Sequence, residues 1–93
     1  MHSSEANNVK FSLTKFRAGY ELAEVDDFLD SLHNALAQWE SGRPGTILAA
    51  EVVQQRFAVT KFRNGYDQDQ VDDFLAKATA TLQAYEKVSK PGY

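Results

Sequence analysis

The sequence predicts an all-α fold made of two copies of one loop-plus-long-helix unit, with the two long helices pairing as a short parallel coiled coil. The first observation is a repeat. TKFRAGYELAEVDDFL, residues 14–29, returns as TKFRNGYDQDQVDDFL, residues 60–75, with 11 of 16 positions identical at an offset of 46 residues. The second is a run of apolar residues at helical spacing within and after each motif. The third is SGRPG, residues 41–45, whose two glycines and proline separate the copies.

The repeat divides the 93-residue chain into repeat 1, residues 1–40, a linker, residues 41–45, and repeat 2, residues 46–90. A chain of this length has room for one small domain or two very small ones. We expect either a compact intramolecular pseudo-dimer or a homodimer in which each repeat pairs with a repeat of another chain. Self-association is expected. KPGY, residues 90–93, is the expected stop signal after the last helix.

Composition excludes several classes of protein. The sequence has no cysteine, so it carries no disulfide framework and no thiolate metal site, which fits a reducing compartment. It has no apolar run of about 18 residues, so we expect no membrane-spanning segment. The net charge is −3, which argues against nucleic acid as a partner because such binding needs a dense basic surface.

Each repeat contains one long helix with a well-marked start. In repeat 2, Asp67 is the predicted N-cap, and Gln70 follows three residues later at the spacing of a capping box. Glu21 and Glu24 hold the same places in repeat 1, with Glu21 the weaker cap.

The apolar residues of these helices alternate in spacings of three and four, which predicts a heptad seam. A helix of about 20 residues is roughly 30 Å long, too short for an isolated coiled coil, so we expect the two seams to pair. The predicted helix-pairing core consists of Val25, Leu29, Leu32, Leu36, Trp39, Val71, Leu75, Leu82 and Tyr85.

A short connecting helix is predicted over residues 47–56, with Thr46 as its N-cap. The matching residues 1–10 of repeat 1 are polar and make a weaker helix candidate. A parallel helix pair needs a return path, and residues 41–66 are long enough to span roughly 30 Å, since an extended residue covers about 3.3 Å.

The loop before each long helix combines one aromatic residue with two cations. The residues are Lys15, Phe16 and Arg17 in repeat 1 and Lys61, Phe62 and Arg63 in repeat 2. Gly19 and Gly65 follow, and we expect them to supply a positive φ. The composition suits a membrane interface, where the ring buries apolar area and the cations meet lipid phosphates. The alternative is that each phenylalanine packs inward and closes the end of its own helix pair.

No enzymatic, metal or cofactor site is expected. Asp26 and Asp27 are consecutive helical residues that point about 100° apart, so they cannot converge on one ion and instead complement the helix dipole. His2 and His33 lack a partner at the i, i+4 spacing of a helical zinc site. No nucleophile motif or glycine-rich phosphate loop occurs.

The pattern FRxGY(D/E)xxxVDDFL, found at residues 16–29 and 62–75, resembles the N-terminal domain of DivIVA-like bacterial cell-division and polarity proteins, here in tandem. ILAAEVVQQRF, residues 47–57, is similar to the short helix before the loop in that family. The resemblance departs from the family in two ways. The loops carry one extra residue, Ala18 or Asn64, relative to the shortest family loops, and the long C-terminal coiled coil of full-length members is missing from this sequence.

The resemblance implies a non-enzymatic cytoplasmic scaffold of Gram-positive bacteria. Such a protein lies at the inner face of the membrane, favours septa or cell poles, and recruits division or cell-wall proteins. In the family, paired domains cross their loops and present a phenylalanine and a neighbouring cation to anionic lipid. By position these correspond to Phe16 and Arg17, and to Phe62 and Arg63.

A second function is consistent with the same residues. The helices could form a docking module for a protein partner, with the loops contacting protein instead of lipid. The feature that separates the two hypotheses is whether Phe16 and Phe62 are exposed together on one face.

Overall fold

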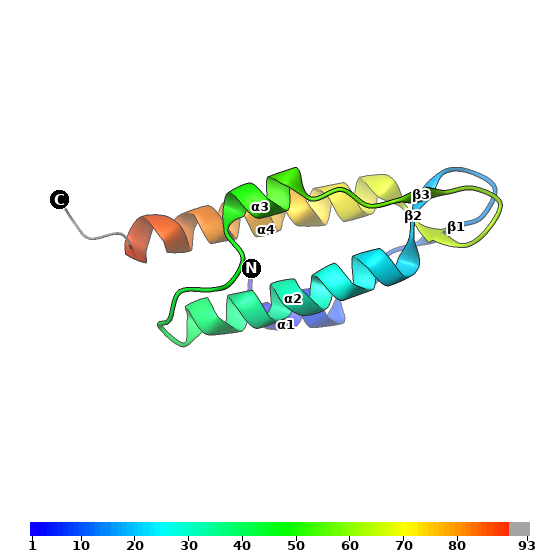
Figure 1. Cartoon of the computed structure of the whole chain (residues 1–93). Helices are drawn as coiled ribbons and strands as arrows, with labels where there is room; N and C mark the ends of the chain where they lie inside the picture. Colours follow the sequence, from blue (N-terminus) through cyan, green and yellow to red (C-terminus); the bar gives the residue numbers. More distant parts are fainter. Residues whose placement is uncertain (90–93) are drawn as a thin grey trace.

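A computed structural model describes residues 1–89, in which four helices and four short strands follow one another along the chain (Figure 1). They are α1 (Ser3–Asn8), β1 (Leu13–Thr14), β2 (Gly19–Tyr20), α2 (Leu22–Glu40), α3 (Ala49–Gln54), β3 (Val59–Thr60), β4 (Gly65–Tyr66) and α4 (Gln68–Ser89). The predicted end of repeat 2 at residue 90 and the predicted stop at residues 90–93 lie outside the described residues.

The prediction of an all-α fold is wrong. The four strands form one antiparallel sheet in the order β1-β4-β2-β3, so the fold is a mixed α/β fold. Each strand has only two residues, which is too short to show the alternating pattern by which strands are recognised in a sequence. The sheet is held by backbone hydrogen bonds between segments that are far apart in the sequence. The periodicity of the side chains contains no information about such pairing.

The sheet joins the two repeats by exchanging their strands. β1 of repeat 1 pairs with β4 of repeat 2, with Leu13 opposite Tyr66, and β3 of repeat 2 pairs with β2 of repeat 1, with Val59 opposite Tyr20. At the centre of the sheet Tyr20 pairs with Tyr66, and these residues are separated by the repeat offset of 46. The sheet therefore has a pseudo-two-fold axis between β2 and β4, and the repeats pair within one chain.

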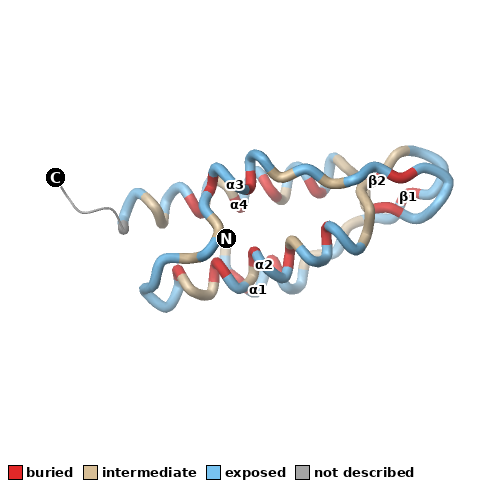
Figure 2. The backbone as a smooth tube through the Cα atoms, viewed as in Figure 1, coloured by how far each residue is buried: buried red, intermediate tan, exposed pale blue. Residues whose placement is uncertain are grey.

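The long helices α2 and α4 both start at the sheet and run in the same direction away from it (Figure 1). Each carries a short helix, since α1 packs on α2 and α3 packs on α4. Residues 1–89 therefore contain two short helices, where the sequence predicted one over residues 47–56 and gave residues 1–10 as a weaker candidate. Buried residues line the inner faces of the helices (Figure 2).

The predicted helix-pairing residues lie in this core. Tyr85 is half-buried, and its ring stacks on Trp39 with centroids 5.7 Å apart and an interplanar angle of 10°. The other predicted positions are buried: Val25, Leu29, Leu32, Leu36, Trp39, Val71, Leu75 and Leu82. Burial of such side chains contributes about 1.5–3 kcal/mol each. The core is shared with the short helices, since Ala6 of α1 and Val52 of α3 belong to it. Each long helix packs most closely on a short helix, so α2 and α4 do not form the predicted two-helix coiled coil.

The two long helices begin where the sequence predicts, but the capping box in repeat 2 is incomplete. Glu21 accepts hydrogen bonds from the amides of Ala23 and Glu24, and Asp67 accepts one from Gln70. The Gln70 side chain does not return to its own cap. It instead accepts a hydrogen bond of 2.7 Å from the amide of Ser12 in the other repeat.

Glu24 does the same in repeat 1, because its carboxylate accepts a hydrogen bond of 2.8 Å from the amide of Ala58. The third position of each long helix therefore binds the neighbouring repeat. These hydrogen bonds between the repeats depend on the three-dimensional fold, so they could not be predicted from the sequence around each helix start.

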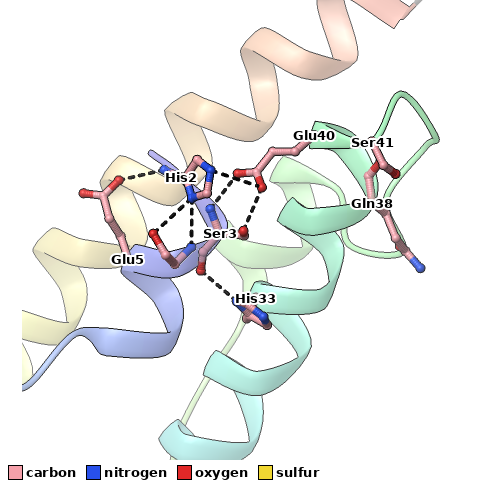
Figure 3. Close-up of polar contacts among 8 residues, drawn as sticks. His2, Ser3, Glu5, His33, Gln38, Glu40 and Ser41 are labelled. Atoms are coloured by element: carbon pink, nitrogen blue, oxygen red, sulfur yellow. Dashed lines mark hydrogen bonds and ion pairs between the residues drawn. The ribbon is translucent and has the colours of Figure 1, made fainter.

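The short helices differ from the prediction at their starts. α3 begins after Leu48, whose amide donates to the Glu51 carboxylate at 2.7 Å, so Thr46 is not its N-cap. The polar segment of repeat 1 also forms a helix, because its first turn is bonded to the end of α2. The amide and hydroxyl of Ser3 donate to Glu40 at 2.6 and 2.7 Å (Figure 3).

Repeat 2 uses the same link, since the amide of Ala49 donates to Glu86 at 2.7 Å. Burial acts to raise the pKa of Glu40, but the hydrogen bonds from Ser3 outweigh it and lower the pKa below its usual value. His33 adds a further bond to the backbone of α1 by donating from Nδ1 to the Ser3 carbonyl at 2.8 Å (Figure 3).

Candidate functional site

The two loops that the sequence analysis singled out lie together at one end of the molecule, beyond the sheet (Figure 1). We call this end the tip and define it as residues 15–18, between β1 and β2, and residues 61–64, between β3 and β4. Both loops leave the same four-stranded sheet, because the repeats exchange strands. The exchange thus places two copies of one motif side by side.

Phe16 and Phe62 are exposed at the tip. Their exposed fractions are 80% and 74%, so the alternative in which each ring packs inward is wrong. Leu13 and Val59, on the two edge strands next to the loops, are also more than half exposed. A cluster of exposed apolar side chains on one small surface is the feature that marks an interaction site.

Two other phenylalanines occupy the inward positions. Phe11 packs against Tyr66 and Phe74, with ring centroids 5.5 and 5.9 Å apart. Phe57 packs in the same way against Tyr20 and Phe28, at 5.3 and 5.8 Å. These contacts also join one repeat to the other. The sequence analysis missed this role, although the recurrence of phenylalanine at the repeat offset was a usable signal.

Gly19 and Gly65 are required for space and not for a positive φ, contrary to the prediction. A Cβ at Gly19 would lie 2.4 Å from Oγ1 of Thr14 and 3.0 Å from the backbone of Gly65 and Tyr66. The two glycines therefore allow β2 and β4 to approach closely at the pseudo-two-fold axis.

Among the non-glycine residues of positions 1–89, Phe62 is the one with a left-handed backbone, at φ 64°. The equivalent Phe16 is not in this region. Such a conformation is uncommon for an aromatic residue and costs of order 1–3 kcal/mol, which makes the loop of repeat 2 a candidate functional position.

Two tyrosine–aspartate hydrogen bonds fix the base of the tip. The Tyr20 hydroxyl donates to Asp72 at 2.8 Å, and the Tyr66 hydroxyl donates to Asp26 at 2.6 Å, each across the repeats. Burial and the bond to Asp72 raise the pKa of Tyr20 to about 12, and the bond to Asp26 and burial raise the pKa of Tyr66 to about 12. Both hydroxyls thus remain donors at neutral pH and hold the tip rigidly on the helices.

Positive charge is concentrated in and next to the tip, and negative charge is concentrated in the helices. None of the 13 acidic residues lies within residues 6–20 or 52–66. Six of the ten lysine and arginine residues do: Lys10, Lys15, Arg17, Arg56, Lys61 and Arg63. A chain with a net charge of −3 therefore presents a cationic end.

Some of the acidic residues behind the tip take part in internal bonds, whereas Asp27, Asp69 and Asp73 are exposed. Glu21 caps α2, Glu24 bonds Ala58, and Asp26 bonds Tyr66. In the other repeat, Asp67 caps α4, and its second carboxylate oxygen lies 2.7 Å from Nη2 of Arg17. These bonds draw the carboxylates toward the protein, which reduces their opposition to an anionic surface at the tip.

Within residues 1–89, no group of three or more metal-ligating side chains is placed to hold an ion. No helix in this range is long and apolar enough to cross a bilayer. Comparison with protein-family models, curated proteins and solved structures found no match for this chain.

Proposed function

We propose that the chain is a non-enzymatic, membrane-binding scaffold module whose tip attaches to anionic lipid. The observation that carries the proposal is the exposure of Phe16 and Phe62 at the same end of the molecule, each beside a lysine and an arginine. An exposed aromatic ring flanked by cations is the side-chain combination expected at a membrane interface.

The expected free energies of interaction with the membrane are sufficient for reversible binding of the chain to anionic lipid. Transfer of one phenylalanine into the acyl boundary contributes roughly 1.5–3 kcal/mol. Each cation near an anionic surface adds about 1 kcal/mol. A single loop would bind weakly, whereas two loops on one rigid sheet benefit from high effective concentration. This gain is the functional reason we propose for a tandem repeat.

The cellular setting of the proposal rests on the sequence resemblance to DivIVA-like domains. It consists of a location at the inner face of the bacterial membrane, at septa or poles, and the recruitment of division or cell-wall proteins. The acidic helices α2 and α4 point away from the tip and would remain accessible to such partners.

A second candidate, a protein-docking module, is favoured by one groove. It has a volume of about 570 Å³ and lies between the segment from α3 to β3 and the first half of α4. Its apolar lining includes Val52, Val53 and Phe57, and Val53 is 60% exposed. A docking function at this groove does not need the tip, so a lipid-binding test separates the two candidates.

The test is co-sedimentation of the native chain with vesicles of phosphatidylglycerol or of phosphatidylcholine. We expect the chain to pellet with phosphatidylglycerol and much less with phosphatidylcholine. Binding should weaken as salt rises, because the Debye length falls from about 10 Å at 0.1 M to about 3 Å at 1 M. A folded chain that stays in the supernatant with phosphatidylglycerol at low salt would refute lipid binding and favour the docking module.

A further inference from the structure

The two loops have equivalent positions in the pseudo-symmetric structure, so their residues can be compared directly. The arginines at these positions, Arg17 and Arg63, differ in their ion-pair partners. Nη2 of Arg17 lies 2.7 Å from Oδ2 of Asp67. The equivalent pair across the repeats is Arg63 and Glu21, and it does not form. Within residues 1–89, Arg63 has no carboxylate within the 4.0 Å that defines an ion pair.

The difference follows from one methylene group. Asp67 has a short side chain, so one oxygen caps the amide of Gln70 and the other faces Arg17. Glu21 is longer and folds back on its own helix, where Oε2 accepts from the amides of Ala23 and Glu24. One oxygen of the Glu21 carboxylate thus bonds its own helix, and no ion pair between Glu21 and Arg63 is present.

The surroundings of Arg63 differ from those of Arg17 in further ways. A pocket of about 270 Å³ lies beside it, lined by Glu21, Leu22, Thr60, Arg63 and Asn64. Asn64 brings an amide donor where repeat 1 has Ala18. The preceding residue, Phe62, holds the left-handed backbone that Phe16 lacks. The pocket, with Asn64 in its lining, and the backbone of Phe62 thus distinguish the second loop.

We infer that Arg63 and Asn64 form the principal phosphate-binding site of the tip, and that Asp67 restrains Arg17 from an equal role. The inference rests on the proposed function, which it makes more specific. The ligand is a phosphate group, carried either by a lipid phosphodiester or by free inorganic phosphate. A guanidinium matches the geometry of two phosphate oxygens, and the Asn64 amide supplies a further donor.

The inference predicts unequal effects of two matched substitutions. Arg63→Gln should weaken binding to phosphatidylglycerol vesicles about fivefold, the equivalent of about 1 kcal/mol per surface cation. Arg17→Gln removes the same charge but should weaken binding less than Arg63→Gln, because the Arg17 guanidinium is held 2.7 Å from the Asp67 carboxylate. Vesicle co-sedimentation isotherms measure both. Equal losses for the two variants would overturn the inference.

Asp67→Asn provides the converse test, since asparagine is as good an N-cap as aspartate and preserves the start of α4. Release of Arg17 should strengthen vesicle binding several-fold, and Arg17→Gln should then weaken binding in the Asp67→Asn background. The control is Asp69→Asn, which changes the charge equally two residues away, where no ion pair is present within residues 1–89. Equal gains for the two aspartate variants would contradict a specific restraint.

Nuclear magnetic resonance separates the two sources of phosphate. Signals of the Arg63 Nε–H and the Asn64 amide are followed during titration with inorganic phosphate and with phosphatidylglycerol vesicles. Shifts with both ligands assign the site to phosphate in general, and shifts with vesicles alone assign it to lipid. The site is wrong if neither ligand shifts these signals, or if Arg17 shifts equally. If the native chain does not bind vesicles, the proposed function fails. In that case, a phosphate-induced shift of the Arg63 signal, without one at Arg17, would still support the phosphate site.

Discussion

Replacing Phe16 and Phe62 together with serine is expected to weaken binding to phosphatidylglycerol vesicles by more than about a hundredfold. Each ring contributes roughly 1.5–3 kcal/mol on leaving water, so the pair accounts for at least about 3 kcal/mol. Both rings are exposed in the folded chain, so their loss removes little buried area. Helix content by circular dichroism and the thermal midpoint should therefore stay close to those of the native chain, while the vesicle isotherm shifts.

The matched control removes two exposed apolar side chains that are not at the tip. Val53 in α3 is 60% exposed, and Val88 near the end of α4 is 84% exposed. The Val53→Ser/Val88→Ser variant should bind vesicles like the native chain. Equal losses in the two double variants would show that general surface hydrophobicity, and not the tip, drives binding.

Replacing Gly19 and Gly65 together with alanine is expected to lower the free energy of unfolding by about 2–6 kcal/mol, since overpacking costs about 1–3 kcal/mol at each site. The added methyl groups would face backbone atoms of the neighbouring strand at 3.0 Å and a threonine hydroxyl at 2.4 and 2.8 Å. Backbone cannot move aside as a flexible side chain can. Urea denaturation followed by circular dichroism measures the loss.

Gly42 supplies the control for this prediction because its requirement is conformational. It has φ 86°, and a Cβ there would meet no atom within 4 Å. Asparagine tolerates a left-handed backbone, so Gly42→Asn should be nearly neutral. Gly65→Asn should be strongly destabilising, since asparagine needs the same space as any other side chain. Similar small effects at both sites would contradict the close approach of β2 and β4.

The long helices could be predicted because their signals are local. The cap residues Glu21 and Asp67 mark the starts of α2 and α4, and the linker from Ser41 marks the end of α2. The heptad spacing correctly identified which side chains are buried, and Tyr85 is only half-buried because it lies near the far end of the pair. These features depend on residues three or four apart in the sequence, so the spacing of apolar residues is enough to recognise them.

The sheet could not be predicted by the same reasoning. Its partners, such as Leu13 and Tyr66, are far apart in sequence, and two-residue strands have no measurable period. The role of Gly65 was misassigned for the same reason, since its neighbour Gly19 lies on another strand. The structure places both predicted loops at one end of the molecule, but the difference between Arg17 and Arg63 depends on how a carboxylate divides its bonds in three dimensions.

The central claim is that both loops enter the lipid together while the far end of the helices stays outside. Trp39 is the single tryptophan, and it lies near the end of α2 that is remote from the tip. In a Trp39→Phe background, Phe16→Trp and Phe62→Trp each place a fluorescent reporter in one loop. The measurement is quenching of each reporter, and of native Trp39, by brominated lipid in phosphatidylglycerol vesicles.

We predict strong quenching of tryptophan at both tip positions and little quenching of Trp39 in the vesicle-bound chain. Quenching at only one tip position would contradict joint insertion of the loops. Vesicle-bound protein in which Trp39 is quenched and neither tip reporter is would contradict the account as a whole, because the membrane contact would then lie at the opposite end of the molecule.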